Sequence, residues 1–134
     1  PHTIGRRQRQ MCIRDRNLIA MIIAKYPCGI DIESTKRDAT QIKHKFLNDD
    51  DFTSGKSSKK LIQNWCSKEV LFKINGRKDI HFKEHLTIKK NGEFFSGYCE
   101  HPEIKFSSTI KVLNFESYFL AFNINYREEV NVIV

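Results

Sequence analysis

Three acidic residues in two segments have the type and spacing of a divalent-cation site. Asp31 and Glu33 alternate with isoleucines, so a strand over residues 28–33 would carry both carboxylates on one face. Glu69 lies in the middle of a segment with helical periodicity. Carboxylates brought together repel one another unless a cation compensates them, and oxygen ligands suit Mg²⁺, which commonly bridges carboxylates to substrate phosphates. The acids therefore predict a magnesium site for a phosphorylated ligand, with Asp31, Glu33 and Glu69 as metal ligands.

Lysines accompany the helical acid. Trp65, Glu69 and Lys73 are spaced four residues apart, so they stack along one face of a helix, and Lys73 can reach the ligand that Glu69 faces. Lys68 lies about 100° around the helix from Glu69 and could reach a phosphate from the flank. We therefore expect Lys68 and Lys73 to bind phosphate groups of the ligand.

Each half of this set also has an ordinary structural explanation. Glu69 and Lys73 could form an exposed i,i+4 ion pair that stabilises the helix by roughly a few tenths of a kcal/mol. Asp31 and Glu33 could be the solvated face of an edge strand. A functional site requires both segments together, so it depends on their lying side by side in the fold.

The elements that would position these residues follow from hydrophobic periodicity. Apolar residues recur at three- and four-residue intervals over residues 58–75, with a serine available as N-cap and Gly76 placed for a left-handed C-cap. This pattern predicts a long amphipathic helix. An apolar run over residues 18–24 is followed by Lys25 and then by Tyr26-Pro27, as expected of a strand followed by a turn.

Strands are predicted to predominate after the helix. Asn91-Gly92 suits a two-residue hairpin turn between strands at 86–90 and 93–96. Further strands are expected at 104–113, 118–124 and 130–134. Two strands, one helix and then several strands with short turns indicate an α+β fold, with a mainly antiparallel sheet packed against one long helix.

The first sixteen residues differ in composition from the rest. They hold five of the eight arginines and a single acid, so they supply four of the seven net positive charges, whereas lysine outnumbers arginine fifteen to three from Asn17 onward. Residues 11–16 also resemble translated adaptor sequence. We therefore predict that residues 1–16 are a non-native or disordered leader and that residues 17–134 form one domain.

Two segments resemble the signature motifs of the 4′-phosphopantetheinyl transferases. Gly29-Ile30-Asp31-Ile32-Glu33 is similar to the first motif, in which a glycine and an apolar residue precede a metal-binding aspartate. Trp65-Cys66-Ser67-Lys68-Glu69, with Lys73 four residues further on, is similar to the second. The glutamate of the first segment and the tryptophan of the second resemble the two-lobed, surfactin-synthetase-activating branch.

The resemblance runs from Asn17 to about Phe122 and covers one lobe of that branch. The interval between the two motifs is shorter than is usual in the branch, and its N-terminal lobe has no counterpart upstream of Asn17. Residues 17–134 are therefore expected to correspond to a C-terminal lobe.

The resemblance implies Mg²⁺-dependent transfer of the phosphopantetheine group from coenzyme A to a serine of an acyl or peptidyl carrier protein. It assigns Asp31, Glu33 and Glu69 to the metal, and Glu69 also to the removal of the serine proton. It assigns Lys73, assisted by Lys68, to the phosphates of coenzyme A. The expected partners are thus the carrier protein and coenzyme A, with neither nucleic acid nor membrane.

Composition favours a cytoplasmic protein and leaves two other functions open. The four cysteines are scattered without a C-x-x-C pair, which suits a reducing compartment, and the longest apolar run, residues 18–24, is shorter than the roughly 20 residues a bilayer requires. One alternative is a catalytically silent fragment that folds or pairs with another lobe. The other is a basic nucleic-acid-binding module, prompted by the net charge of +7 and by aromatic residues such as Phe94 and Tyr98.

Overall fold

The computed structural model describes residues 2–4, 8–15, 18–52, 57–76, 78–125 and 128–134. In chain order the elements are β1 (His2–Ile4), β2 (Gln8–Asp15), β3 (Leu18–Ala24), β4 (Ile30–Ser34), the 3₁₀ helix η1 (Lys43–Lys45), α1 (Ser58–Asn75), α2 (Phe82–His85), β5 (Leu86–Asn91), β6 (Phe94–His101), β7 (Ile104–Phe115), β8 (Tyr118–Ile124) and β9 (Val130–Ile133). The predicted α+β class, with antiparallel sheet and one long helix, is confirmed.

The larger sheet has five strands in the order β4-β8-β7-β6-β5, and every neighbouring pair is antiparallel. The predicted hairpin joins β5 to β6, but its turn lies one residue later than expected, because Asn91 pairs with Phe94 and leaves Gly92 and Glu93 as the loop. Gly92, the first residue of this turn, has a φ of 62°, a conformation that glycine adopts readily and residues with a side chain do not.

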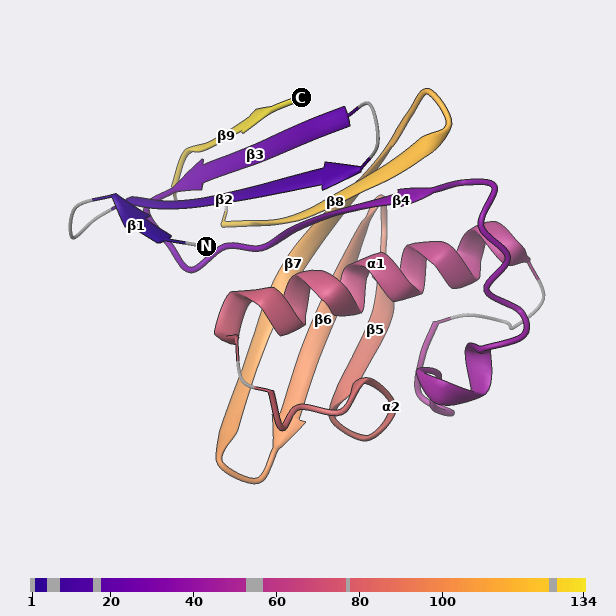
Figure 1. Ribbon diagram of the computed structural model, residues 1–134. Helices are drawn as coiled ribbons and strands as arrows, with labels where there is room; N and C mark the ends of the chain where they lie inside the picture. The colour runs from indigo at the N-terminus through magenta and orange to yellow at the C-terminus, as the bar shows by residue number, and fades with distance from the viewer. Residues whose placement is uncertain (1, 5–7, 16–17, 53–56, 77, 126–127) are drawn as a thin grey trace.

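The helix α1 lies across one face of the five-stranded sheet (Figure 1). Its bounds match the predicted helix, and Gly76 ends it with a φ of 73° while its N–H donates to Phe72 O, as the expected left-handed cap requires. Leu61, Val70 and Leu71 of α1 pack with Ile88, Phe95 and Ile110 of the sheet. This apolar core fixes the rotation of α1 and therefore the direction in which its polar residues point.

A second sheet, in the order β1-β2-β3-β9, adds a second core. Alternate residues of β3 pack with residues of β4 and β8, and this core includes Ala20, Ile22, Ala24, Ile30, Ile32, Leu120 and Phe122. Both faces of β4 are thus covered near its start, one by the second sheet and one by α1.

The described part of residues 1–16 contains two strands that the sequence analysis did not predict. β1 and β2 lie in this segment, and β2 pairs with β3 in antiparallel register from Arg9 to Asp15. Backbone groups form such a ladder whatever the composition of the side chains, so an arginine-rich segment can still pair as a strand. Whether the segment is native sequence stays a prediction.

Candidate functional site

The two segments that carry the predicted site touch each other in the fold. At Gly29, just before β4, an added Cβ would lie only 2.5 Å from Val70 O and 3.3 Å from Lys73 Cβ of α1. A glycine is therefore what allows this backbone to approach the helix so closely. Asp31 follows two residues later, on the part of β4 that α1 covers.

Asp31 and Lys73 form the centre of the contact. Lys73 Nζ donates to Asp31 Oδ1 and to Ile30 O, both at 3.0 Å. Asp31 is only 4% exposed, and its second oxygen, Oδ2, is buried and has no hydrogen-bond partner among the described residues. Burial raises the pKa of Asp31 to about 8 against the opposing charge of Lys73, and the nearby carboxylates of Glu33 and Glu69 raise it further.

Glu33 is held by an aromatic and a cationic side chain. Trp65 Nε1 donates to Glu33 Oε1 at 2.8 Å, and Arg37 Nη1 donates to Glu33 Oε2 at 3.0 Å. The Arg37 guanidinium also lies over the Trp65 ring, 5.6 Å from its centroid. Both oxygens of Glu33 therefore accept a hydrogen bond, and a metal would have to share this carboxylate with Arg37 and Trp65.

Glu69 lies on the same side of α1 as Lys73, and no ion pair or hydrogen bond joins its carboxylate to another described residue. Burial raises the pKa of Glu69, Lys73 and Arg37 oppose this rise, and Glu33 adds to it. Glu69 lies one helical turn from Trp65, which donates to Glu33, and one turn from Lys73, which donates to Asp31, so it is on the side of α1 that faces both acids. The structure thus brings Asp31, Glu33, Glu69 and Lys73 together, and it adds Arg37, which the sequence analysis did not select.

The donor atoms of this group suit a hard cation. Among the residues that the structure describes, Asp31 Oδ2 is a buried acceptor that lacks a partner and Glu69 is a second carboxylate without one, so an oxygen-binding cation such as Mg²⁺ fits their chemistry. As the side chains stand, no three His, Cys, Asp or Glu residues within the described ranges are grouped closely enough to hold a metal ion. Metal binding at this group therefore requires side-chain movement.

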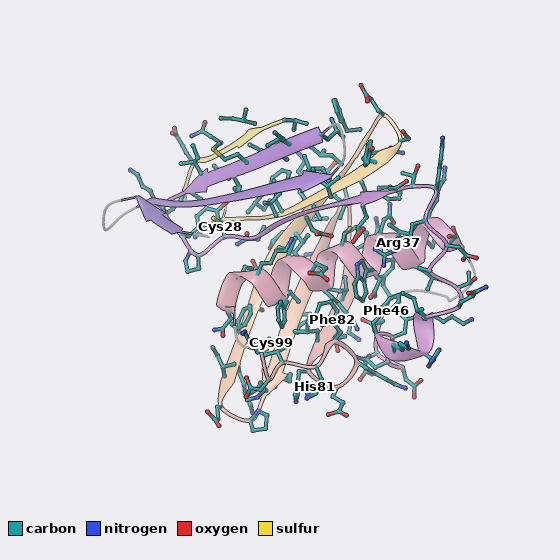
Figure 2. The ribbon with its side chains drawn as sticks, in the orientation of Figure 1. Cys28, Arg37, Phe46, His81, Phe82 and Cys99 are labelled. Atoms are coloured by element: carbon teal, nitrogen blue, oxygen red, sulfur yellow. The ribbon has the colours of Figure 1, made fainter. Side chains whose placement is uncertain are left out.

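Lys68 is not part of the group. Its side chain is fully buried, and Nζ donates to Asp51 Oδ2 at 2.8 Å, to Phe82 O at 3.1 Å and to Phe46 O. Phe46 and Phe82 lie below α1 in the view of Figure 2. We therefore correct the prediction that Lys68 binds a phosphate, because its ammonium is enclosed by protein groups and cannot reach a ligand.

This enclosure gives Lys68 a structural role. Asp51 Oδ1 accepts from Ile88 N and its Oδ2 accepts from Asn48 N, so the ion pair ties α1 to the loop that precedes it and to β5. Burial lowers the pKa of Lys68, and the adjacent Asp51 carboxylate opposes this effect. A buried charge that is paired and fully hydrogen-bonded in this way is strongly destabilising to remove.

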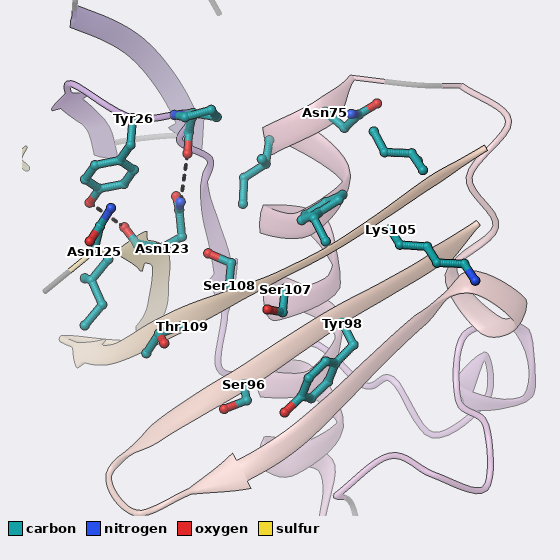
Figure 3. A pocket seen from close by; sticks show the side chains of 15 residues that line it. Tyr26, Asn75, Ser96, Tyr98, Lys105, Ser107, Ser108, Thr109, Asn123 and Asn125 are labelled. Atoms are coloured by element: carbon teal, nitrogen blue, oxygen red, sulfur yellow. Dashed lines mark hydrogen bonds between the residues drawn. The ribbon is translucent and has the colours of Figure 1, made fainter. Parts of the chain in front are cut away.

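Asn123 of β8 orients the segment that leads into β4. Its Oδ1 accepts from Gly29 N at 2.8 Å. Its Nδ2 donates to Pro27 O at 2.9 Å, and its backbone oxygen accepts from Tyr26 OH at 3.0 Å (Figure 3). The sequence held a signal for this role, since Asn123 is a polar residue within an otherwise apolar strand. For Arg37 the signal was weaker: it is one of only three arginines beyond residue 16.

A separate cavity of about 830 Å³ lies at the C-terminal end of α1. Figure 3 shows hydroxyl and amide side chains around it, including Ser96, Tyr98, Ser107, Asn75 and Asn123. None of the predicted site residues lines it. The cavity and the acidic group are therefore different features of the molecule.

In the part of the chain that the structure describes, no helix is both long enough and apolar enough to cross a bilayer. A scan against protein-family models, a search of curated proteins and a search of solved structures found no match for this chain.

Proposed function

We propose that this protein transfers the 4′-phosphopantetheine group of coenzyme A, with Mg²⁺, to a serine hydroxyl of an acyl or peptidyl carrier protein. The observation that carries the proposal is the Asp31 carboxylate, which is buried, has one oxygen without a partner in the described part of the chain, and lies near Glu33, Glu69 and Lys73. A structural ion pair between Asp31 and Lys73 alone would not explain the two further acids gathered around it. The resemblance of both segments to the transferase motifs supports the same chemistry.

Asp31 and Glu69 would hold the metal, and Glu33 would join them through the second lone pair of its Oε2, so that it keeps its contacts with Arg37 and Trp65. When bound, Mg²⁺ supplies charge neutralisation at the pyrophosphate of coenzyme A. Lys73 would leave Asp31 for the phosphate oxygens and stabilise the charge that develops on them. Its present position, 3.0 Å from Asp31 Oδ1, keeps this ammonium beside the oxygens that would bind the metal.

The reaction needs one proton acceptor and no covalent enzyme intermediate. The serine oxygen forms a bond to the phosphorus that carries pantetheine, while the bond from that phosphorus to the bridging oxygen breaks and adenosine 3′,5′-bisphosphate leaves with the electron pair. Glu69 would take the serine proton. Burial raises the pKa of Glu69, which makes its carboxylate a stronger base than that of an exposed glutamate.

The test is the substitution Glu69→Gln, read by mass spectrometry of an apo carrier protein incubated with coenzyme A and Mg²⁺. We expect the wild-type chain to add the phosphopantetheine mass and Glu69→Gln to lower the rate at least about a hundredfold, since it removes both a base and a metal ligand. Glu93→Gln, in the β5–β6 turn, is the matched control and should leave the rate unchanged.

Two results would contradict the proposal. A rate retained by Glu69→Gln would remove Glu69 from the chemistry. A wild-type chain that binds coenzyme A but never modifies any carrier would instead favour the catalytically silent fragment.

A further inference from the structure

The Arg37 side chain is held beside Asp31, Glu33 and Glu69, but only part of its guanidinium takes part in the contacts that hold it. Only Nη1 donates to Glu33, and neither Nη2 nor Nε makes a hydrogen bond to a described residue. The side chain is 46% exposed, so a ligand can reach it from solvent. A guanidinium presents five donors in a planar fork, which matches the oxygens of a phosphate group.

The anchors hold this fork in one place. The Trp65 ring lies beneath the guanidinium, and Trp65 Nε1 and Arg37 Nη1 donate to the same carboxylate of Glu33. The backbone is held as well, because Arg37 N donates to Ser34 O and Ser58 Oγ donates to Arg37 O. An arginine restrained before a ligand arrives loses less conformational entropy on binding it.

Once a divalent cation is bound, the charges around the Arg37 guanidinium favour an anionic ligand. Asp31, Glu33 and Glu69, when ionised, carry three negative charges against the two positive charges of Lys73 and Arg37. A divalent cation makes this group net positive, which complements a pyrophosphate. Arg37 covers the Trp65 ring, and Trp65 lies one helical turn before Glu69, whereas Lys73 lies one turn after it. Arg37 and Lys73 are therefore on opposite sides of Glu69 along the helix.

We infer that Arg37 is a further substrate-binding residue, and that its free N–H groups bind the pyrophosphate of coenzyme A across the metal site from Lys73. The inference rests on the proposed function, because it requires coenzyme A and Mg²⁺ at the acidic group. It assigns Glu33 and Trp65 the task of positioning the Arg37 guanidinium.

Calorimetric titration of the chain with coenzyme A in Mg²⁺ tests the inference, with dephospho-coenzyme A, which lacks the 3′-phosphate, as a second ligand. We expect Arg37→Ala to weaken the binding of both ligands by the same factor, roughly ten- to a hundredfold. Arg37→Lys, which keeps the charge but loses the fork, should give an intermediate loss. Lys89→Ala removes an equal charge from β5, at the far edge of the sheet, and should change neither affinity.

The possible outcomes separate this inference from the proposed function. Unchanged affinity in Arg37→Ala, or a loss confined to coenzyme A with its 3′-phosphate, would overturn the assignment of Arg37 to the pyrophosphate while leaving the proposed function standing. Equal losses in Arg37→Ala and Lys89→Ala would also overturn it, because only long-range charge would then matter. A wild-type chain that shows no Mg²⁺-dependent binding of either ligand would overturn both.

Discussion

At the scale of single residues, Asp31 shows how far burial can outweigh an ion pair. Lys73 lies 3.0 Å from its Oδ1, and an exposed aspartate with such a partner would have a lowered pKa. Instead the pKa is raised to about 8, because the surrounding protein removes water from the carboxyl group. A carboxylate in this position gains more from a further cation than an exposed one does.

The pKa of Asp31 predicts how stability depends on pH. Between the ordinary value of 3.8 and the folded value of about 8, the folded state holds a proton that the unfolded state has released. The contribution of Asp31 to the free energy of unfolding is therefore full below about pH 4 and falls as pH rises toward 8. Urea unfolding between about pH 5 and pH 8 should show a steeper decline for the wild type than for Asp31→Asn.

Mg²⁺ serves as an internal control in that experiment. Binding to the ionised carboxylate should reduce the decline in the wild type and have little effect on Asp31→Asn. Parallel pH profiles for the two proteins would contradict the raised pKa.

At the scale of elements, α1 is enclosed on more sides than its sequence pattern indicates. The sheet covers the face with Leu71, β4 covers the side with Lys73, and the loop with Phe46 covers the direction in which Lys68 points. Helical spacing correctly separated Lys68 from Glu69 by about 100°. It could not reveal that protein rather than ligand lies in that direction.

The close approach of β4 to α1 predicts a large effect of Gly29→Ala. The new Cβ would lie 2.5 Å from Val70 O, a backbone atom that cannot move without distorting the helix. We expect a loss of about 1–3 kcal/mol in the free energy of unfolding. Movement of β4 should also separate Asp31 from Lys73 and weaken Mg²⁺ binding, which calorimetry would measure.

Gly76→Ala is the matched comparison for Gly29→Ala. An added Cβ there meets no atom of the described residues within 4 Å, although φ is 73°. Its cost of about 1 kcal/mol therefore comes from backbone strain and should leave Mg²⁺ binding unchanged. If both variants lowered stability and metal affinity equally, close packing at Gly29 would not be what positions the site.

At the scale of the whole molecule, β8 connects the two cores. Phe119 and Ala121 belong to the core beneath α1, while Leu120 and Phe122 belong to the core shared with the second sheet. Successive strand residues point to opposite faces, so a nearly continuous apolar run is what a strand buried on both sides requires. Asn123 follows directly and holds the segment that enters β4.

A chain that begins at Asn17 tests the contribution of the first strands. β2 pairs with β3 from Arg9 to Asp15, and β3 also pairs with β9 on its other side. We expect the truncation to remove the β2 pairing and therefore to lower the thermal midpoint. The core around α1 should persist, with Trp65 fluorescence and Mg²⁺-dependent coenzyme A binding retained. An unchanged midpoint would instead support the leader that the composition predicted.

The sequence by itself determined the α+β class, the bounds of α1 with its glycine cap, and the candidate acids Asp31, Glu33 and Glu69. These follow from periodicity, capping and charge, which depend on residues close together along the chain. Local reasoning did not predict the strands β1 and β2 in the first sixteen residues, because strand pairing joins separate segments through backbone hydrogen bonds that composition does not specify.

Only the tertiary structure decided which of these residues meet and what surrounds them. Lys68 pairs with the buried Asp51, and Arg37 contacts Glu33 and Trp65. Asn123 accepts a hydrogen bond from Gly29 N, next to α1. Each of these contacts joins different elements of the fold or depends on their packing. Burial and partners are properties of segments brought together in space, so no pattern along the chain could specify them.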